Sequence, residues 1–190
     1  MDVRIVREGP ERLPDYESVP IAYESNSRVD LARLAADGTV VEVPSPERVK
    51  DYDAVLDERP TSLAIRFEME SWGIFAAFDG EARLGGIIVA PGGQGYALCG
   101  DFPFAAVIVD VRVDPRSRGM GIGCSLLSAG LSWLEGLGDG TVLVETQDTN
   151  PAACRFYWAS GFGILSIAIN GYGDGIDEAK LIWRRDLTRF

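Results

Sequence analysis

The stretch Val107–Leu137, VIVDVRVDPRSRGMGIGCSLLSAGLSWLEGL, decides the fold of this chain. Its first part alternates β-branched with charged residues, which predicts a strand over Val107–Asp114 with one core face and one charged face. Apolar residues then recur at helical spacing at Ile122, Leu126, Leu127, Leu131, Leu134 and Leu137. This spacing predicts a helix of about a dozen residues that packs one face on a sheet.

The turn Arg118–Gly123, with sequence RGMGIG, has a glycine at every second position. Such a turn lets successive backbone N–H groups face an anion, and the positive end of the following helix adds to the attraction. We therefore expect a pyrophosphate to bind here. A P-loop would need a lysine in the turn, and a dinucleotide fingerprint would need a third glycine where Cys124 or Leu126 stands.

A second motif lies one predicted strand further along the chain. Thr141–Gln147 predicts a buried strand, and it is followed by the pattern Asn-x-x-Ala-x-x-Phe-Tyr-x-x-x-Gly-Phe from Asn150 to Phe162. Together with Arg-x-x-Gly-x-Gly at Arg118, this pattern resembles the acetyl-CoA site of the GNAT N-acetyltransferase superfamily. Five segments narrow the resemblance to its streptothricin acetyltransferase branch: Glu24–Arg28, Trp72–Ala77, Asp110–Val113, Val144–Gln147 and Asn150–Tyr157.

The resemblance implies acetyl-CoA as cosubstrate and no metal. It places the cofactor on the strand, the glycine turn and the second motif, where main-chain N–H groups of the strand would polarise the thioester carbonyl. The implied cofactor-binding residues are Val111, Arg112, Val113, Arg116, Arg118, Gly119, Met120, Gly121, Ile122, Gly123, Cys124, Asn150, Ala153, Phe156 and Tyr157.

Acyl transfer requires that a protonated amine lose its proton before it attacks. Asp110 is the first candidate for the base, because it lies in mid-strand on the charged face just before the turn, and Glu145 on the next strand is the second. Two alternatives stay open. Asp110 could form a structural ion pair with Arg112, or both carboxylates could hold a cationic substrate.

Tyr157 matches the GNAT general acid by position, where a phenol returns a proton to the leaving thiolate. Its alternative is an aromatic packing role beside Phe156. Asn150 either reaches the cofactor, caps the helix ahead of a proline, or does both. Arg116 and Arg118 either meet phosphates or are ordinary solvated charges.

The pattern of elements predicts an α+β fold, with a mixed sheet and helices on both faces. The resemblance implies the GNAT fold: a mostly antiparallel twisted sheet with a splayed parallel strand pair. Besides the strands above, strands are expected over Val3–Arg7, Val40–Val43, Trp72–Phe78, Arg83–Ala90, Ile164–Ile169 and Ala179–Arg184. Helices are expected over Asp15–Val19 and, at the surface, over Glu47–Glu58, with Pro44 and Pro46 ending the strand before it.

At 190 residues, 46% of them hydrophobic, the chain is expected to form one domain over 1–190. Residues 1–70 would be an elaborated N-terminal part and residues 105–163 the acetyl-CoA-binding core. The chain lacks an apolar signal core and a long apolar run, so we expect a cytoplasmic protein without a membrane segment. Cys99, Cys124 and Cys154 fit reduced thiols better than a disulfide framework.

Histidine is absent, which excludes Ser-His-Asp catalysis, histidine bases and histidine metal sites. The net charge of −11 argues against a nucleic-acid partner. It suits a cationic substrate, although an acidic surface also simply confers solubility.

The sequence thus predicts an acetyl-CoA-dependent N-acetyltransferase that acts on a small cationic amine, with streptothricin-type antibiotics as one acceptor class. A protein N-terminal or lysine acetyltransferase and a non-catalytic acyl-CoA sensor are the alternatives. The resemblance also allows a homodimer.

Overall fold

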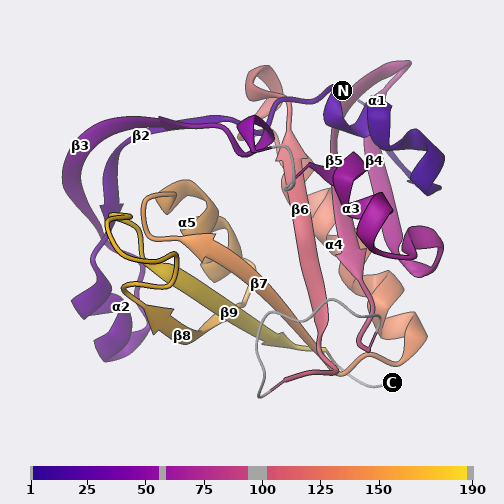
Figure 1. Ribbon diagram of the computed structural model, residues 1–190. Coiled ribbons are helices and arrows are strands. Elements are labelled where there is room, and N and C mark those ends of the chain that lie inside the picture. Colours follow the sequence, from indigo (N-terminus) through magenta and orange to yellow (C-terminus); the bar gives the residue numbers. More distant parts are fainter. Residues whose placement is uncertain (1, 56–58, 94–101, 188–190) are drawn as a thin grey trace. The chain divides into compact units, whose positions relative to one another are not determined.

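The structure is a computed structural model that describes residues 2–55, 59–93 and 102–187 (Figure 1). In chain order the main elements are β1 (Val3–Glu8), α1 (Leu13–Glu17), β2 (Tyr23–Val29), α2 (Leu31–Asp37), β3 (Glu42–Lys50), α3 (Pro60–Arg66), β4 (Gly73–Asp79), β5 (Ala82–Ala90), β6 (Ala106–Val113), α4 (Ile122–Leu137), β7 (Thr141–Gln147), α5 (Pro151–Ala159), β8 (Gly163–Ala168) and β9 (Lys180–Asp186). The large sheet has the strand order β1-β4-β5-β6-β7-β9-β8 and is mostly antiparallel, with β6 and β7 as a parallel pair. The expected mixed fold is confirmed.

The chain divides into two compact units, and the first comprises the described parts of 1–22, 51–142 and 187–190. Here β1, β4, β5 and β6 form an antiparallel sheet in that order. The ring of Tyr16 in α1 lies against Gly86 of β5, where an added Cβ would be 2.3 Å from Tyr16 Cε2. Gly130 of α4 instead lies against the neighbouring Ile87. Because successive strand residues face opposite ways, α1 and α4 cover opposite faces of this sheet.

The core on the α1 face is one hydrophobic cluster. It consists of Leu13, Tyr16, Leu63, Met69, Trp72, Ile74, Ile88 and Ala90. Glu17, the last residue of α1, accepts a 2.5 Å hydrogen bond from the backbone N–H of Thr61 in the first turn of α3. This contact ties the two short helices together over the sheet.

Helix α4 has 16 residues and buries Ile122, Leu126, Leu127, Leu131 and Leu134, as its spacing predicts. Leu137 does not follow the prediction: it is 55% exposed. It is the final helical residue, directly before the left-handed Gly138 that ends the helix, so the apolar stripe stops one turn earlier. Within the described ranges, no helix combines the length and apolar character needed to cross a membrane.

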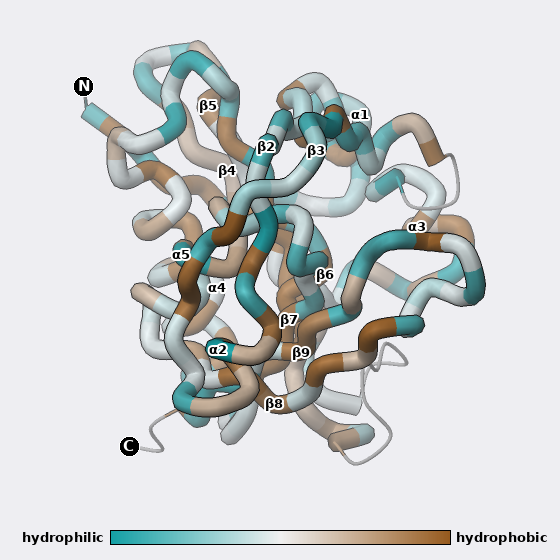
Figure 2. The backbone as a smooth tube through the Cα atoms, turned by 90° about the vertical axis from the view of Figure 1, so that its left-hand side faces the viewer, coloured by the Kyte–Doolittle hydropathy of each residue, from teal (hydrophilic) through white to brown (hydrophobic). Residues whose placement is uncertain are grey.

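The second unit comprises 23–50 and 143–186. It holds the two-stranded ribbon of β2 and β3, the antiparallel pair of β8 and β9, and helices α2 and α5. Figure 2 shows hydrophobic residues gathered in the strands of the sheet and largely hydrophilic residues along β2 and β3. Trp183 of β9 is completely buried and donates a 2.8 Å hydrogen bond to Thr146 of β7.

The expected helix over Glu47–Glu58 is wrong, as is the expected end of a strand at Pro44. Strand β3 runs from Glu42 to Lys50, and a 3₁₀ turn follows at Tyr52–Ala54; residues 56–58 lie outside the described part. Strand β3 pairs with β2 and, among the described strands, with no other. A strand with an unpaired edge tolerates proline, because the missing N–H is not needed there.

Both cysteines within the described residues are free thiols, as expected. Cys124 is exposed in the first turn of α4, and Cys154 is buried in α5. Cys99 lies outside the described residues.

Candidate active site

The glycine turn leads from β6 into α4 in the first unit. Gly119 and Gly121 have φ of +75° and +83°, left-handed values that favour glycine. A Cβ added at either position would meet nothing within 4 Å, so both glycines border open space. Gly121 precedes α4 without a side-chain cap, so the first N–H groups of a 16-residue helix are offered to a ligand.

The other residues of the turn are at least partly exposed to solvent, except Ile122. Met120 and Cys124 are exposed and Gly123 is partly so. Ile122 is 1% exposed and anchors the helix in the core. The main chain of the turn is therefore open to solvent while the helix behind it is fixed.

The two arginines of the turn differ in what they contact. Arg116 is at the surface and pairs with Asp114 at 2.7 Å, a contact that lowers the pKa of Asp114 to about 2. Arg118 donates to the carbonyl oxygens of Val113 at 3.1 Å and Ala22 at 2.9 Å. Arg118 therefore fastens the start of the turn to the end of β6, whereas Arg116 projects into solvent.

Asp110 and Arg112 of β6 form an ion pair on the face toward α1. Arg112 Nη2 lies 2.7 Å from Asp110 Oδ2, and Nε lies 3.0 Å from Oδ1. The guanidinium also contacts both oxygens of Asp53 and the carbonyl of Val19. Burial by itself would lower the pKa of Arg112, but the hydrogen bonds and charge of Asp110 raise it. Of the roles left open for Asp110, the ion pair is the one with visible contacts.

A phenol completes this group. Tyr16 is buried and donates a 2.7 Å hydrogen bond to Asp110 Oδ1, and its pKa is raised by burial and by the Asp110 charge. Asp110 thus accepts hydrogen bonds from two groups, the Arg112 guanidinium and the Tyr16 hydroxyl. Sequence reasoning missed Tyr16 and Asp53, because both are distant in sequence from Asp110.

Helix α5 carries the second motif in the second unit. Asn150 Oδ1 accepts a 3.1 Å hydrogen bond from the N–H of Ala153, with Pro151 as the first helical residue, so the expected N-cap is present. Tyr157 is 5% exposed and its ring packs edge-on against Phe156, at 5.0 Å between centroids, and against Phe162, at 5.4 Å. The expected aromatic packing of Tyr157 is therefore also present.

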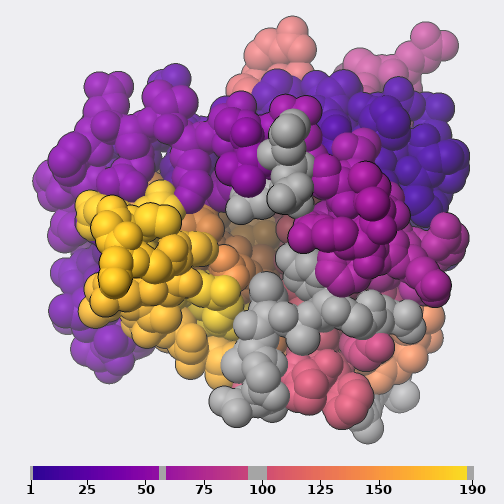
Figure 3. All heavy atoms as spheres, viewed as in Figure 1, coloured from indigo at the N-terminus to yellow at the C-terminus, as the bar shows by residue number. Residues whose placement is uncertain are grey.

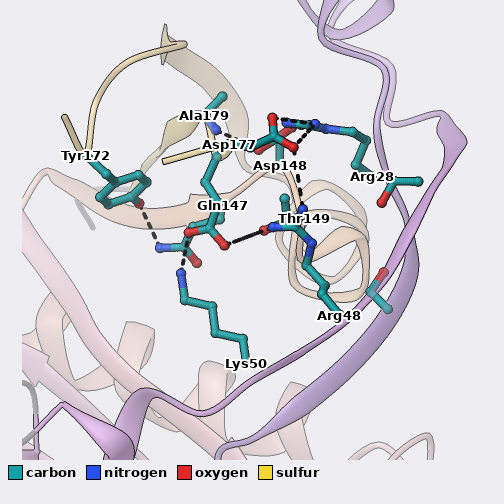
Figure 4. A network of polar contacts seen from close by, with 12 residues as sticks. Arg28, Arg48, Lys50, Gln147, Asp148, Thr149, Tyr172, Asp177 and Ala179 are labelled. Carbon is teal, nitrogen blue, oxygen red and sulfur yellow. Dashed lines mark hydrogen bonds and ion pairs between the residues drawn. The ribbon is translucent and has the colours of Figure 1, made fainter. Parts of the chain in front are cut away.

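Glu145 of β7 lies in a polar network, part of which Figure 4 shows. Its Oε1 accepts a 2.7 Å hydrogen bond from the Tyr172 hydroxyl, and its Oε2 lies 2.7 Å from Lys180 Nζ. Tyr172 belongs to the loop between β8 and β9, and Lys180 begins β9. Sequence reasoning missed both residues. The signal that was available is the run Gly-Tyr-Gly-Asp-Gly at Gly171–Gly175, which predicts a tight loop but no partner.

The structure thus places the proposed site residues in two groups. The first unit holds Asp110, Val111, Arg112, Val113, Arg116, Arg118, Gly119, Met120, Gly121, Ile122, Gly123 and Cys124; the second unit holds Glu145, Asn150, Ala153, Phe156 and Tyr157. Among the described residues, no group of three or more histidine, cysteine or acidic residues could hold a metal ion.

The glycine turn that follows β6 and the capped aromatic helix that follows β7 both lie within a stretch shared with known proteins. The sequence model of the acetyltransferase (GNAT) family matches residues 39–162 of this chain. A mycothiol acetyltransferase from Geodermatophilus obscurus is 33% identical over an alignment of 102 residues, which covers 50% of this chain and 31% of that protein. The chain therefore spans about a third of the length of this relative.

Two solved structures have a similar fold. A candidate streptothricin acetyltransferase from Bacillus anthracis str. Ames, in complex with acetyl coenzyme A, has a TM-score of 0.74 at 19% identity and covers 97% of this chain and 99% of its own. Nourseothricin acetyltransferase has a TM-score of 0.71 at 18% identity, with 99% and 100% covered. Because the family match includes more than half of the residues, the chain belongs to the acetyltransferase (GNAT) family.

Proposed function

We propose that this chain transfers the acetyl group of acetyl-CoA directly to a primary amine of a small cationic acceptor. The observation that carries the proposal is the exposed, left-handed main chain at Gly119 and Gly121, placed before the uncapped N-terminus of α4. This arrangement fits the pyrophosphate of a coenzyme A, because an anion is stabilised by free N–H groups and by the positive end of a helix.

The residues that would hold the cofactor are those that the family resemblance implies, and the exposed main chain of the glycine turn supports this assignment. Main-chain N–H groups from Gly119 to Cys124 would bind the pyrophosphate, and the exposed Arg116 side chain would exchange its ion pair with Asp114 for a phosphate. By the same resemblance, main-chain groups of Val111–Val113 would bind the acyl-carrying arm, and Asn150, Ala153 and Phe156 of the second motif would contribute further contacts to the cofactor. The Arg112 side chain is committed to Asp110 and Asp53, so its contribution would come from the main chain.

Acetyl-CoA supplies an activated acyl group, and the chain would supply proton transfer at two points. The acceptor ammonium must lose a proton to become a nucleophile, and the departing thiolate must gain one. We assign the second role to Tyr157, because a phenol held beside the leaving thiolate can donate its proton to the sulfur. For the base that takes the proton of the acceptor ammonium, we rank Glu145 above Asp110.

The hydrogen bonds of the two carboxylates support this ranking. Asp110 accepts from Arg112 Nε, Arg112 Nη2 and the Tyr16 hydroxyl, so three of its roughly four acceptor sites are in use. Its side chain is 9% exposed, against 22% for Glu145. Glu145 accepts from Tyr172 and Lys180, so about two of its roughly four acceptor sites are left for a hydrogen bond from the acceptor ammonium.

A small cationic acceptor is supported by the net charge of −11 and by the fold shared with streptothricin and nourseothricin acetyltransferases. The test is a thiol-release assay with acetyl-CoA and a panel of streptothricin, polyamines, aminoglycosides, lysine derivatives and short peptides. Release that depends on one cationic small amine supports the proposal. Release with peptides alone would favour a protein acetyltransferase. Binding of acetyl-CoA in calorimetry without release would favour a sensor, and absence of both would overturn the cofactor site.

A further inference from the structure

The Glu145 carboxylate is held at both oxygens by residues from one short loop and the strand after it. Tyr172 and Lys180 are eight residues apart, and Gly171 explains how they meet. A Cβ added at Gly171 would lie 2.5 Å from Lys180 Cβ, so the loop closes against the start of β9 only with glycine there. This close approach brings Tyr172 and Lys180 to the same carboxylate, Glu145 of β7. Figure 4 shows the Tyr172 hydroxyl facing Gln147 of the same strand.

The hydrogen bond from Tyr172 to Glu145 has a fixed direction. Gln147 Nε2 donates a 2.7 Å hydrogen bond to the Tyr172 oxygen, and an amide NH₂ group only donates. The single phenolic proton is therefore left for Glu145 Oε1, at 2.7 Å. Burial and the hydrogen bond to Glu145 both raise the pKa of Tyr172, so the phenol keeps its proton at neutral pH. In this series of hydrogen bonds Gln147 donates to Tyr172, and Tyr172 donates to Glu145.

The ring of Tyr172 is fixed by two ammonium groups. Lys50 Nζ lies 5.8 Å and Lys180 Nζ 6.0 Å from the ring centroid, within the range of cation–π contacts. These are the two lysines of a chain whose other basic residues are all arginine. Lys50 is held in turn by an ion pair with Glu178, and Lys180 by its pair with Glu145. Both lysines thus keep the phenol aimed at the carboxylate.

This network reaches the surface of its unit. Figure 3 shows residues of the β8–β9 loop, in yellow, at the surface next to residues of β3, in purple. Arg48 of β3 pairs with Glu178 at 3.3 Å and with Asp177 at 3.6 Å, so ion pairs secure the loop to the ribbon. The loop that carries Tyr172 is therefore anchored rather than free.

We propose that Tyr172 is a positioning residue for the Glu145 carboxylate, with Gln147 fixing the direction of its hydrogen bond and Lys50 and Lys180 holding its ring. The inference rests on the proposed function, in which Glu145 takes the proton of the acceptor ammonium. Glu145 is the group that meets the acceptor; Tyr172 acts through it. If the carboxylate turned away from the amine, the reaction would slow, because a base must lie within hydrogen-bonding distance of the proton that it takes.

The test is a double-mutant cycle in the thiol-release assay, with the acceptor that the panel identifies. We expect Tyr172→Phe, which keeps the ring and removes only the hydroxyl, to lower kcat by about ten-fold or more while the KM for acetyl-CoA stays unchanged. In the Glu145→Gln background the same substitution should have no further effect on kcat, because the base through which it acts is gone.

The matched control is Tyr23→Phe, which removes a phenolic hydroxyl in the same unit that contacts Thr149 at 3.3 Å. It should leave kcat within about two-fold in both backgrounds. An unchanged kcat for Tyr172→Phe, or an equal loss with and without Glu145, would overturn the positioning role while leaving the acetyltransferase proposal intact. Absence of release by the unsubstituted protein with every amine would overturn the proposed function, and this inference with it.

Discussion

The Tyr16 hydroxyl donates a 2.7 Å hydrogen bond to Asp110 across 94 residues of sequence. Asp110 also pairs with Arg112, whose side chain is 1% exposed. The nearly buried charge of Asp110 therefore has two partners, Tyr16 from α1 and Arg112 from β6. A buried ion pair is costly to break because the remaining charge is left without a partner. The network therefore makes stability a sensitive readout for the role of Asp110.

We expect Asp110→Asn to lower the free energy of unfolding by about 3 kcal/mol, since Arg112 keeps Asp53 but loses its most buried partner. Urea denaturation followed by fluorescence measures this. Asp114→Asn, which faces the exposed Arg116, is the control and should cost far less. If Asp110→Asn left stability unchanged but abolished turnover, Asp110 would be a catalytic base and not a structural ion-pair partner.

Gly121→Ala should weaken acetyl-CoA binding by about ten-fold, because φ of +83° is strained for alanine and relaxation of the turn would move the N–H groups that face the ligand. Isothermal calorimetry gives the affinity. The matched control is Gly136→Ala in the same helix, where an added Cβ meets nothing within 4 Å and the backbone is helical. Equal affinity for the two variants would remove the turn from the cofactor site.

The glycine turn shows how far local sequence reaches. A glycine at every second position, between an alternating strand and an apolar helical stripe, predicts a strand, a glycine turn and a helix. The structure has β6, the left-handed Gly119 and Gly121, and α4 in that order. The same holds for Asn150, where the N-cap can be read from the Pro151 that follows it. These features depend on neighbours within a few residues.

Contacts between distant segments are what the sequence could not supply. The partners of Asp110 come from α1 and from the turn at Tyr52–Ala54, and those of Glu145 from the β8–β9 loop. Each carboxylate was a candidate from its strand position alone, but nothing in the strand indicates which cation or phenol will face it. The length of strand β3 also depends on a distant contact. Pro44 and Pro46 end a strand that pairs on both edges, and the sequence does not show that one edge of β3 is unpaired among the described strands.

Tyr157→Phe should lower kcat by about 10²-fold or more with little change in acetyl-CoA affinity, because the phenol would protonate the leaving thiolate while its ring packs against Phe156 and Phe162. Keeping the ring preserves that packing, so thermal unfolding should stay close to that of the unsubstituted protein. Steady-state kinetics and calorimetry measure the two effects separately. Unchanged turnover would remove Tyr157 from the mechanism.

The two described thiols should differ sharply in reactivity. Burial raises the pKa of Cys154 to about 12, and its thiol contacts Thr146 at 3.3 Å, so little thiolate forms and access is closed. Cys124 is exposed in the first turn of α4. Brief alkylation of the native protein, followed by peptide mass spectrometry, should label Cys124 and spare Cys154 until denaturant is added. Rapid labelling of Cys154 in the native state would contradict the closed packing of α5.

Pro44 and Pro46 have a consequence for behaviour at high concentration. A two-stranded ribbon with an open edge is a template on which a second molecule could add a strand. Each proline removes a backbone N–H from β3, and Glu47 and Arg48 place charges directly after them. The residues that made this strand hard to recognise are thus the ones that discourage edge-to-edge aggregation of the protein.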